Sequence, residues 1–416
     1  MMRRRNYNIN DSYRVTHSSI SQYSSNYRQT RARRKRLSSL IICLVFLGVI
    51  VVSTFLLIGY FIKDDNGHEM FSIFEDKKKI YEKDNSDEVY YFYNQINDKE
   101  KEVYDEILEG ILEYDKVIKV SSNSIEEIDK IKNMILADHP ELFWFTGSCS
   151  TISYIDRIDL KMEYCFKENE LEQRANEIEK KAQEFDNTLS ESDTEYDIIR
   201  KAYLFVIDTV DYDLNASYNQ TVYSSLVNNS SVCAGYSKAM QLLAQRNGVQ
   251  ALYVWGPADG INGWEDHAWN IIRCDGKYYQ VDVTFADSYN KNKRIEELGV
   301  HNFNYLCIDD ETMYRNHKIS NSLMVPKCDS KELNYYVLNN LYSDTYGEYV
   351  ISSMKRYVNK GKNVWRFQFS NYESYAECLE DIKKGKFSSI LYEDLKVLTQ
   401  TFYTCDEAMY SVMCWY

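Results

Sequence analysis

A cysteine, a histidine and an aspartate, which together can support nucleophilic catalysis, occur in this order within one stretch of the chain. They lie in Val232-Cys233-Ala234-Gly235-Tyr236, Asp266-His267-Ala268-Trp269-Asn270 and Val281-Asp282-Val283-Thr284. A cysteine attacks a carbonyl as its thiolate, which needs a neighbouring base, and the base needs an acceptor that orients it. The question for the fold is therefore whether the three side chains meet.

Cys233 is expected in the first turn of a helix. Ser230 and Ser231 are residue types that favour the N-cap, the run from Ala239 to Arg246 is helical in character, and Asn247-Gly248 is a strong stop signal. The positive end of a helix dipole favours a thiolate, and the backbone N–H groups there can receive an oxyanion. We expect a helix of roughly four turns with the cysteine in its first turn.

His267 and Asp282 are expected on two strands of one hairpin. The strands are predicted at Ala268 to Arg273 and Lys277 to Val283. Asp275-Gly276 between them favours a two-residue turn. This turn would pair Trp269 with Asp282 and His267 with Thr284, so that the histidine and the aspartate become diagonal neighbours about 7–8 Å apart at Cα. A slip of one residue would place them on opposite faces of the sheet.

This stretch resembles the core of the transglutaminase-like superfamily, the papain-like enzymes with a Cys–His–Asp triad. The matching motifs are Val-Cys-Ala-Gly-Tyr, His-Ala-Trp-Asn and Tyr-Gln-Val-Asp-Val-Thr-Phe-Ala-Asp, within Tyr196 to Asp287, and a looser match continues through Asn304-Tyr305-Leu306. The resemblance implies Cys233 as nucleophile, His267 as base and Asp282 as the group that orients the base. The superfamily includes cross-linking acyltransferases, peptidases, amidases and inactive members, so it does not fix the reaction.

Four further residues are candidates for the substrate or oxyanion site: Tyr212, Gly235, Tyr236 and Trp269. For the three aromatic residues, packing or the wall of a cleft is the alternative role. Gly235 would permit the close approach of backbone or substrate beside the cysteine. The backbone N–H of Cys233 is the expected first oxyanion donor.

The other histidines and the acidic residues suggest no further chemistry. His301 and His317 are not expected to act as bases, because neither faces a carboxylate on a paired strand. The chain has no CxxC pair and no ligand run like an EF-hand, so we expect neither zinc nor calcium and no cofactor.

Charge is distributed unevenly along the 416 residues, whose formal net charge is −14. The globular part has no basic stripe, which argues against a nucleic-acid partner. Residues 1–39 are rich in arginine and serine and are expected to form a disordered tail.

Leu40 to Ile62 contains no charged side chain and would form a helix of about 34 Å, enough to cross a bilayer. Basic residues precede the segment and Lys63-Asp64-Asp65 follows it. The positive-inside rule therefore predicts a single-pass membrane protein with a cytoplasmic N-terminus and an extracellular catalytic domain. Eight cysteines lie outside the membrane segment if Cys233 is not counted, and an extracellular location would allow them to form disulfides. Their spacing does not indicate which cysteines pair.

The expected fold class is α+β: a helix that carries the cysteine packs on an antiparallel sheet that carries the histidine and the aspartate, with α+β units on both sides. The predicted divisions are a basic tail at 1–39, a transmembrane helix at 40–62, a linker at 63–87, an accessory unit at 88–167, the catalytic domain at 168–325 and a second accessory unit at 326–416. Gly256 to Asp266 is expected to be a loop at the rim of the cleft, and His301 to Leu306 a last core strand.

The function expected from these features is that of a membrane-anchored cysteine acyltransferase or hydrolase that acts on protein or peptide amides through a thioacyl intermediate. One alternative is a hydrolase of cell-wall peptide or protein. Another is a surface scaffold or adhesion module that has kept the fold without its chemistry.

Overall fold

The computed structural model describes residues 90–260, 263–287, 300–396 and 401–416, all within one compact unit, Glu69–Tyr416. The predicted tail, transmembrane segment and linker, residues 1–87, lie outside the described residues. Across the described ranges, no helix has the length and apolar character required to cross a membrane.

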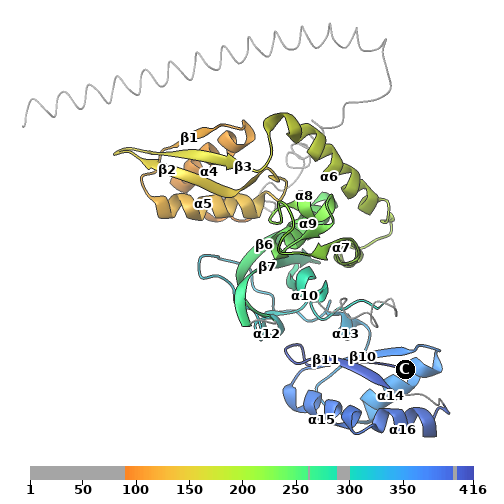
Figure 1. Cartoon of the computed structure of the whole chain (residues 1–416). Coiled ribbons are helices and arrows are strands. Elements are labelled where there is room, and N and C mark those ends of the chain that lie inside the picture. The colour runs from red at the N-terminus through yellow and green to blue at the C-terminus, as the bar shows by residue number, and fades with distance from the viewer. Residues whose placement is uncertain (1–89, 261–262, 288–299, 397–400) are drawn as a thin grey trace, which may run out of the picture. The chain divides into compact units, whose positions relative to one another are not determined.

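The first part of the described chain is a three-stranded antiparallel sheet of order β1-β3-β2 with two helices (Figure 1). Its elements are η1 (Tyr93–Gln95), α4 (Asp98–Leu112), β1 (Val117–Val120), α5 (Ile125–Asp138), β2 (Phe145–Ser153) and β3 (Ile158–Tyr164). Asn97 and Glu100 form a capping box at the start of α4, and the Ser124 side chain caps α5. Helix, strand, helix and strands therefore follow the predicted order.

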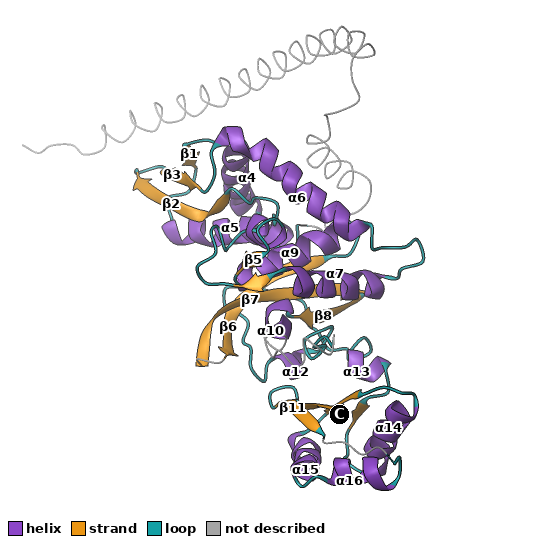
Figure 2. Ribbon diagram, turned by 45° about the vertical axis from the view of Figure 1, so that its right-hand side comes forward, coloured by secondary structure: helices purple, strands orange, loops and turns teal. Residues whose placement is uncertain are grey.

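The central part combines a second antiparallel sheet, of order β6-β7-β8, with the helix that begins at Cys233. Its elements are η2 (Glu168–Glu170), α6 (Leu171–Asp186), α7 (Glu195–Thr209), β4 (Asp211–Tyr212), α8 (Val222–Leu226), β5 (Ser230–Ser231), α9 (Cys233–Arg246), β6 (Ala251–Gly260), β7 (Gly263–Cys274), β8 (Lys277–Val281), α10 (Val283–Asp287) and α12 (Asp310–Met313). Helix α9 packs against β6 and β7 (Figure 2).

Helix α9 begins at Cys233 and ends at Arg246, as the sequence predicts. The predicted serine cap is wrong, because Ser230 and Ser231 form the short strand β5, parallel to β4. The N-cap is Val232, which has no capping side chain. The N–H groups of the first turn therefore depend on other partners.

The hairpin of β7 and β8 turns at Asp275-Gly276, and both residues have positive φ, 50° and 77°. The pairing of Cys274 with Lys277 is confirmed. The strand nevertheless ends one residue earlier than the predicted pairing of Asp282 requires. The chain enters α10 instead, and the backbone N–H of Phe285 donates to Asp282 Oδ1 at 2.9 Å. The predicted pairing of His267 with Thr284 is therefore wrong.

The predicted rim loop, Gly256 to Asp266, is instead the continuation of β6 and β7, which pair from Ala251↔Ile272 to Gly260↔Gly263. Gly256 is required by a close contact and not by a turn. A Cβ there would lie 2.0 Å from the carbonyl oxygen of Lys318, in a segment that runs along the edge of β6. The glycine at position 256 thus has a tertiary cause.

We expect Gly256→Ala to lower the free energy of unfolding by about 1–3 kcal/mol, because the added methyl group must displace the backbone at Lys318. Gly260→Ala is the matched control on the same strand, since its Cβ would meet no atom closer than 4.0 Å. Urea denaturation of both variants measures the difference. Equal midpoints would contradict the close approach.

The predicted core strand His301 to Leu306 is also wrong, because this segment has no regular structure and only an isolated bridge joins Gln280 to Ile308. The last part of the chain has a four-stranded sheet of order β11-β12-β10-β9. Its elements are α13 (Tyr335–Leu338), β9 (Tyr342–Ser343), α14 (Glu348–Asn359), β10 (Val364–Phe369), α15 (Tyr372–Lys383), α16 (Lys386–Glu393), β11 (Phe402–Asp406) and β12 (Ser411–Trp415).

Two hydrophobic clusters form the core. The larger extends from Phe92 to Cys328 and adds Met409, so the first sheet and the central part share it. Gln241 of α9, whose side chain donates to the carbonyl oxygen of Ala137 at 2.7 Å, links the same two parts. The second cluster belongs to the C-terminal sheet and its helices. The nine described cysteines are all free thiols, so none of them forms the disulfides that an exported domain would allow.

Candidate active site

His267 and Asp282 meet at the start of α10. The Nε2–H of His267 donates to Asp282 Oδ2 at 2.7 Å. The carboxylate is fully buried, and the imidazole side chain is 8% exposed. Asp282 reaches this position because strand β8 stops at Val281 and the aspartate caps α10 with its other oxygen.

Cys233 is the second hydrogen-bond partner of the imidazole. It is partly exposed and is the first residue of α9, and its thiol is hydrogen-bonded to His267. Because Asp282 occupies Nε2, the Nδ1 atom is the nitrogen available to the thiol. The three side chains are thus arranged in the order thiol, imidazole, carboxylate.

The electrostatics of the pair favour an imidazolium. Burial lowers the pKa of His267, but the charge of Asp282 and the hydrogen bonds with Asp282 and Cys233 outweigh it and raise the pKa to about 10. Burial likewise raises the pKa of Asp282, yet the charge of His267 and the hydrogen bonds from His267 and His317 hold it well below its usual range. At neutral pH the aspartate is therefore ionised and the histidine protonated.

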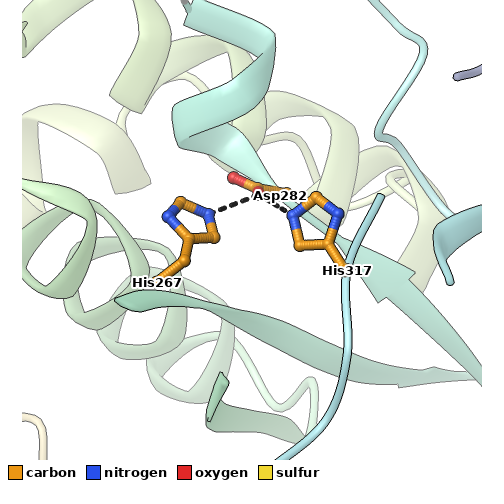
Figure 3. Close-up of side chains that lie close together, drawn as sticks. All are labelled: His267, Asp282 and His317. Atoms are coloured by element: carbon orange, nitrogen blue, oxygen red, sulfur yellow. Dashed lines mark hydrogen bonds and ion pairs between the residues drawn. The ribbon is translucent and has the colours of Figure 1, made fainter. Parts of the chain in front are cut away.

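The sequence predicts no carboxylate opposite His317, and this prediction is wrong. Its Nε2 lies 3.0 Å from Asp282 Oδ2, the same oxygen that accepts from His267. The two imidazoles approach the carboxylate from opposite sides (Figure 3). No local pattern distinguishes His317 from His301, which pairs instead with the exposed Asp208 at 2.7 Å.

Aromatic rings enclose the two histidines. Trp269 lies 5.0 Å from the ring of His317, and Phe285 lies 4.9 Å from His267 and 4.6 Å from His317, measured between ring centroids. Trp269 is fully buried and its indole N–H donates to Gln280 Oε1 at 2.7 Å. The prediction of a substrate or oxyanion role for Trp269 is therefore wrong, since its only donor is already used.

Gly235 and Tyr236 are also packing residues. A Cβ on Gly235 would lie 1.9 Å from Ser231 Oγ, so this glycine makes room for a serine side chain and not for a substrate. Tyr236 is fully buried, and its hydroxyl lies 2.6 Å from the carbonyl oxygen of Val210 and 2.8 Å from Asp287 Oδ2. Neither residue presents a surface to a ligand, which corrects their predicted role.

Tyr212 differs from the other three candidates because it is partly exposed and close to the cysteine. Burial, followed by the charges of Cys233 and Glu265, raises the pKa of Tyr212. Its ring is 6.2 Å from that of Tyr236. A role for Tyr212 beside the acyl group stays a prediction.

Two groups of side chains within the described residues have metal-binding types and spacing. One is His267, Asp282 and His317, and the other is Glu195, Cys274 and Asp275. In the first group, ordinary hydrogen bonds of 2.7 and 3.0 Å already account for the convergence. In the second, two exposed carboxylates surround a buried thiol. The absence of a metal cofactor stays a prediction.

Helix α9 begins at Cys233 and packs on the sheet that carries His267, and Asp282 follows the last strand of this sheet. This arrangement is that of a papain-like fold. Residues 183–283 match the model of the transglutaminase-like superfamily, and the chain thus contains a transglutaminase-like domain.

A curated relative is similar to part of the chain. Kyphoscoliosis peptidase of Homo sapiens is 24% identical over 111 residues, which cover 24% of this chain and 17% of that protein. The chain thus spans less than a fifth of the length of this relative.

Two solved structures are similar to about a third of the chain. One is a crystal structure of a TGase, with 14% identity, a TM-score of 0.25 and coverage of 33% of this chain and 44% of that one. The other is a Cytophaga hutchinsonii protein proposed to be a cysteine protease, with 12% identity, a TM-score of 0.22 and coverage of 33% and 61%.

Proposed function

We propose that this protein is a cysteine acyltransferase or hydrolase that acts on amide groups of proteins or peptides. The observation that carries the proposal is the position of His267, which is hydrogen-bonded to both Cys233 and Asp282. The membership of residues 183–283 in the transglutaminase-like superfamily supports it.

The proposed reaction has two steps. The Cys233 thiolate attacks the amide carbonyl carbon, the C–N bond breaks, and the proton on His267 passes to the leaving amine, which leaves a thioacyl enzyme. An incoming water or amine then gives its proton to the neutral imidazole and releases the acyl group as an acid or a new amide.

The start of α9 supplies donors for the oxyanion of the tetrahedral intermediate. Gly235 and Tyr236 donate to the carbonyl oxygen of Val232 at 3.0 and 3.1 Å. The N–H groups of Cys233 and Ala234, by contrast, have no backbone acceptor within the described part of the chain. Two adjacent N–H groups beside the thiol fit the charge that develops on the carbonyl oxygen.

Hydrolysis of a peptide, including cell-wall peptide, is the second candidate, and the similarity to kyphoscoliosis peptidase favours it. We also propose an extracellular catalytic domain anchored by residues 40–62, on the basis of the uncharged segment and the basic residues before it.

The test is alkylation of Cys233 by iodoacetamide in the full-length chain in mild detergent, read by peptide mapping from pH 5 to pH 9. We expect rapid labelling at pH 6 and a rate at least about tenfold lower in His267→Ala, because an unassisted cysteine is only about 0.3% thiolate at that pH. Cys405 is exposed and serves as an internal reference thiol. Equal rates with and without His267 would refute the catalytic proposal and favour a non-catalytic scaffold.

A further inference from the structure

His317 reaches the site through a segment far from the triad in sequence. After α12, residues 316–320 run along the edge of β6: Asp259 N–H donates to the carbonyl oxygen of Asn316 at 2.7 Å, and Lys318 N–H to that of Pro257 at 2.9 Å. Gly256 makes this close approach possible. The backbone that carries His317 is thus held against the sheet that carries His267.

The imidazole of His317 is fully buried and has a partner at each nitrogen. Nε2 contacts Asp282 Oδ2 at 3.0 Å, and Nδ1 lies 2.7 Å from the side-chain oxygen of Asn316. The Asn316 amide contacts the Tyr305 hydroxyl at 3.0 Å in turn. These contacts fix the direction of the ring, so that its Nε2 is aimed at the carboxylate.

The carboxylate of Asp282 is thereby fully occupied. Oδ2 accepts from His267 and His317, and Oδ1 accepts from the N–H of Phe285. Burial lowers the pKa of His317, while its contact with Asp282 opposes the shift. Because a carboxylate can only accept, the proton of this contact lies on Nε2 of His317. Burial, and with it the charge of Asp282, raises the pKa of two nearby tyrosines, Tyr203 from α7 and Tyr212 from β4.

We infer that His317 is a positioning residue of this site: its Nε2–H holds Asp282 Oδ2 toward His267 and keeps the carboxylate ionised, so that the shared proton resides on the imidazole. The inference rests on the proposed function. The site then consists of four side chains, Cys233, His267, Asp282 and His317. The family resemblance implies only the first three.

Two variants distinguish the effect of the Nε2–H donor of His317 from the effect of the volume of its side chain. His317→Leu removes the N–H and keeps bulk, whereas His317→Gln places an amide N–H where Nε2 lies. His301→Leu is the matched control, because His301 also pairs with an aspartate but does so at the surface. Each is made in the full-length chain and checked by its thermal unfolding transition.

The readout is the ratio of the rates at which iodoacetate and iodoacetamide alkylate Cys233, followed against pH. An imidazolium attracts the anionic reagent, so the ratio falls when His267 loses its proton. In the wild type and in His317→Gln we expect this fall near pH 10. In His317→Leu we expect it about one pH unit lower, since Asp282 is no longer held toward His267 and the ion pair weakens.

Each outcome decides a question. An unshifted fall in folded His317→Leu would overturn the positioning role while leaving the proposed function intact. A ratio that is unchanged in His267→Ala would instead refute the cysteine–histidine pair itself. If His317→Leu does not fold, His317→Asn replaces it, because the shorter amide does not reach Asp282; identical profiles for Asn and Gln would then overturn the inference.

Discussion

Asp282→Asn should slow the alkylation of Cys233 at pH 6 by about two orders of magnitude and lower the free energy of unfolding by about 3–5 kcal/mol. The amide is nearly isosteric with the carboxylate, but it has one acceptor oxygen and no charge. Three donors converge on Asp282, from His267, His317 and the backbone of Phe285. At least one of them must face the NH₂ group, and the imidazolium loses its counter-ion.

The matched control for this substitution is Asp208→Asn, which removes the carboxylate from the exposed pair with His301. Surface pairs of this kind contribute about 0–1 kcal/mol, so we expect little change in stability and none in the labelling of Cys233. Urea denaturation and the alkylation rate are measured on both variants. Labelling of Asp282→Asn at the wild-type rate would show that the carboxylate does not support the base.

The stability contributed by His267 should depend on pH in a defined direction. The pKa of His267 is raised to about 10 in the folded protein, so its contribution is complete below about pH 6.5, declines above that value and is lost beyond pH 10. The pKa of Asp282 is depressed, so the contribution is present above about pH 4 and is lost as the pH falls further. The pair is one interaction, and its full contribution lies between about pH 4 and 6.5.

We therefore expect His267→Gln to destabilise the protein more at pH 6 than at pH 10, by a difference of about 4 kcal/mol. Urea denaturation of the wild type and the variant at the two pH values measures it. His301→Gln is the control, because its exposed partner should make the difference between the two pH values small. A destabilisation by His267→Gln that is equal at both values would mean that His267 is neutral in the folded protein.

Those parts of the site that depend on local chemistry can be predicted from the amino-acid sequence. The stop at Asn247-Gly248 and the helical run before it define α9, so Cys233 was predicted at the start of this helix. Asp275-Gly276 adopts the positive φ values that a two-residue hairpin requires, so the register at Cys274↔Lys277 also followed. A helix stop and a hairpin turn each depend on only a few consecutive residues, so both can be predicted without knowledge of the tertiary structure.

The other contacts of the site arise from the folding of distant segments onto one another. Asp282 meets His267 because the strand stops and a helix begins, which depends on how α10 packs against α7 and α9. His317 lies 35 residues beyond Asp282 and reaches it through a segment that no strand pattern marks. Gly256, predicted as part of a loop, is a strand residue whose missing side chain admits that segment. These contacts join residues distant in sequence, and their energies come from burial and mutual hydrogen bonding that exist only once the chain has folded.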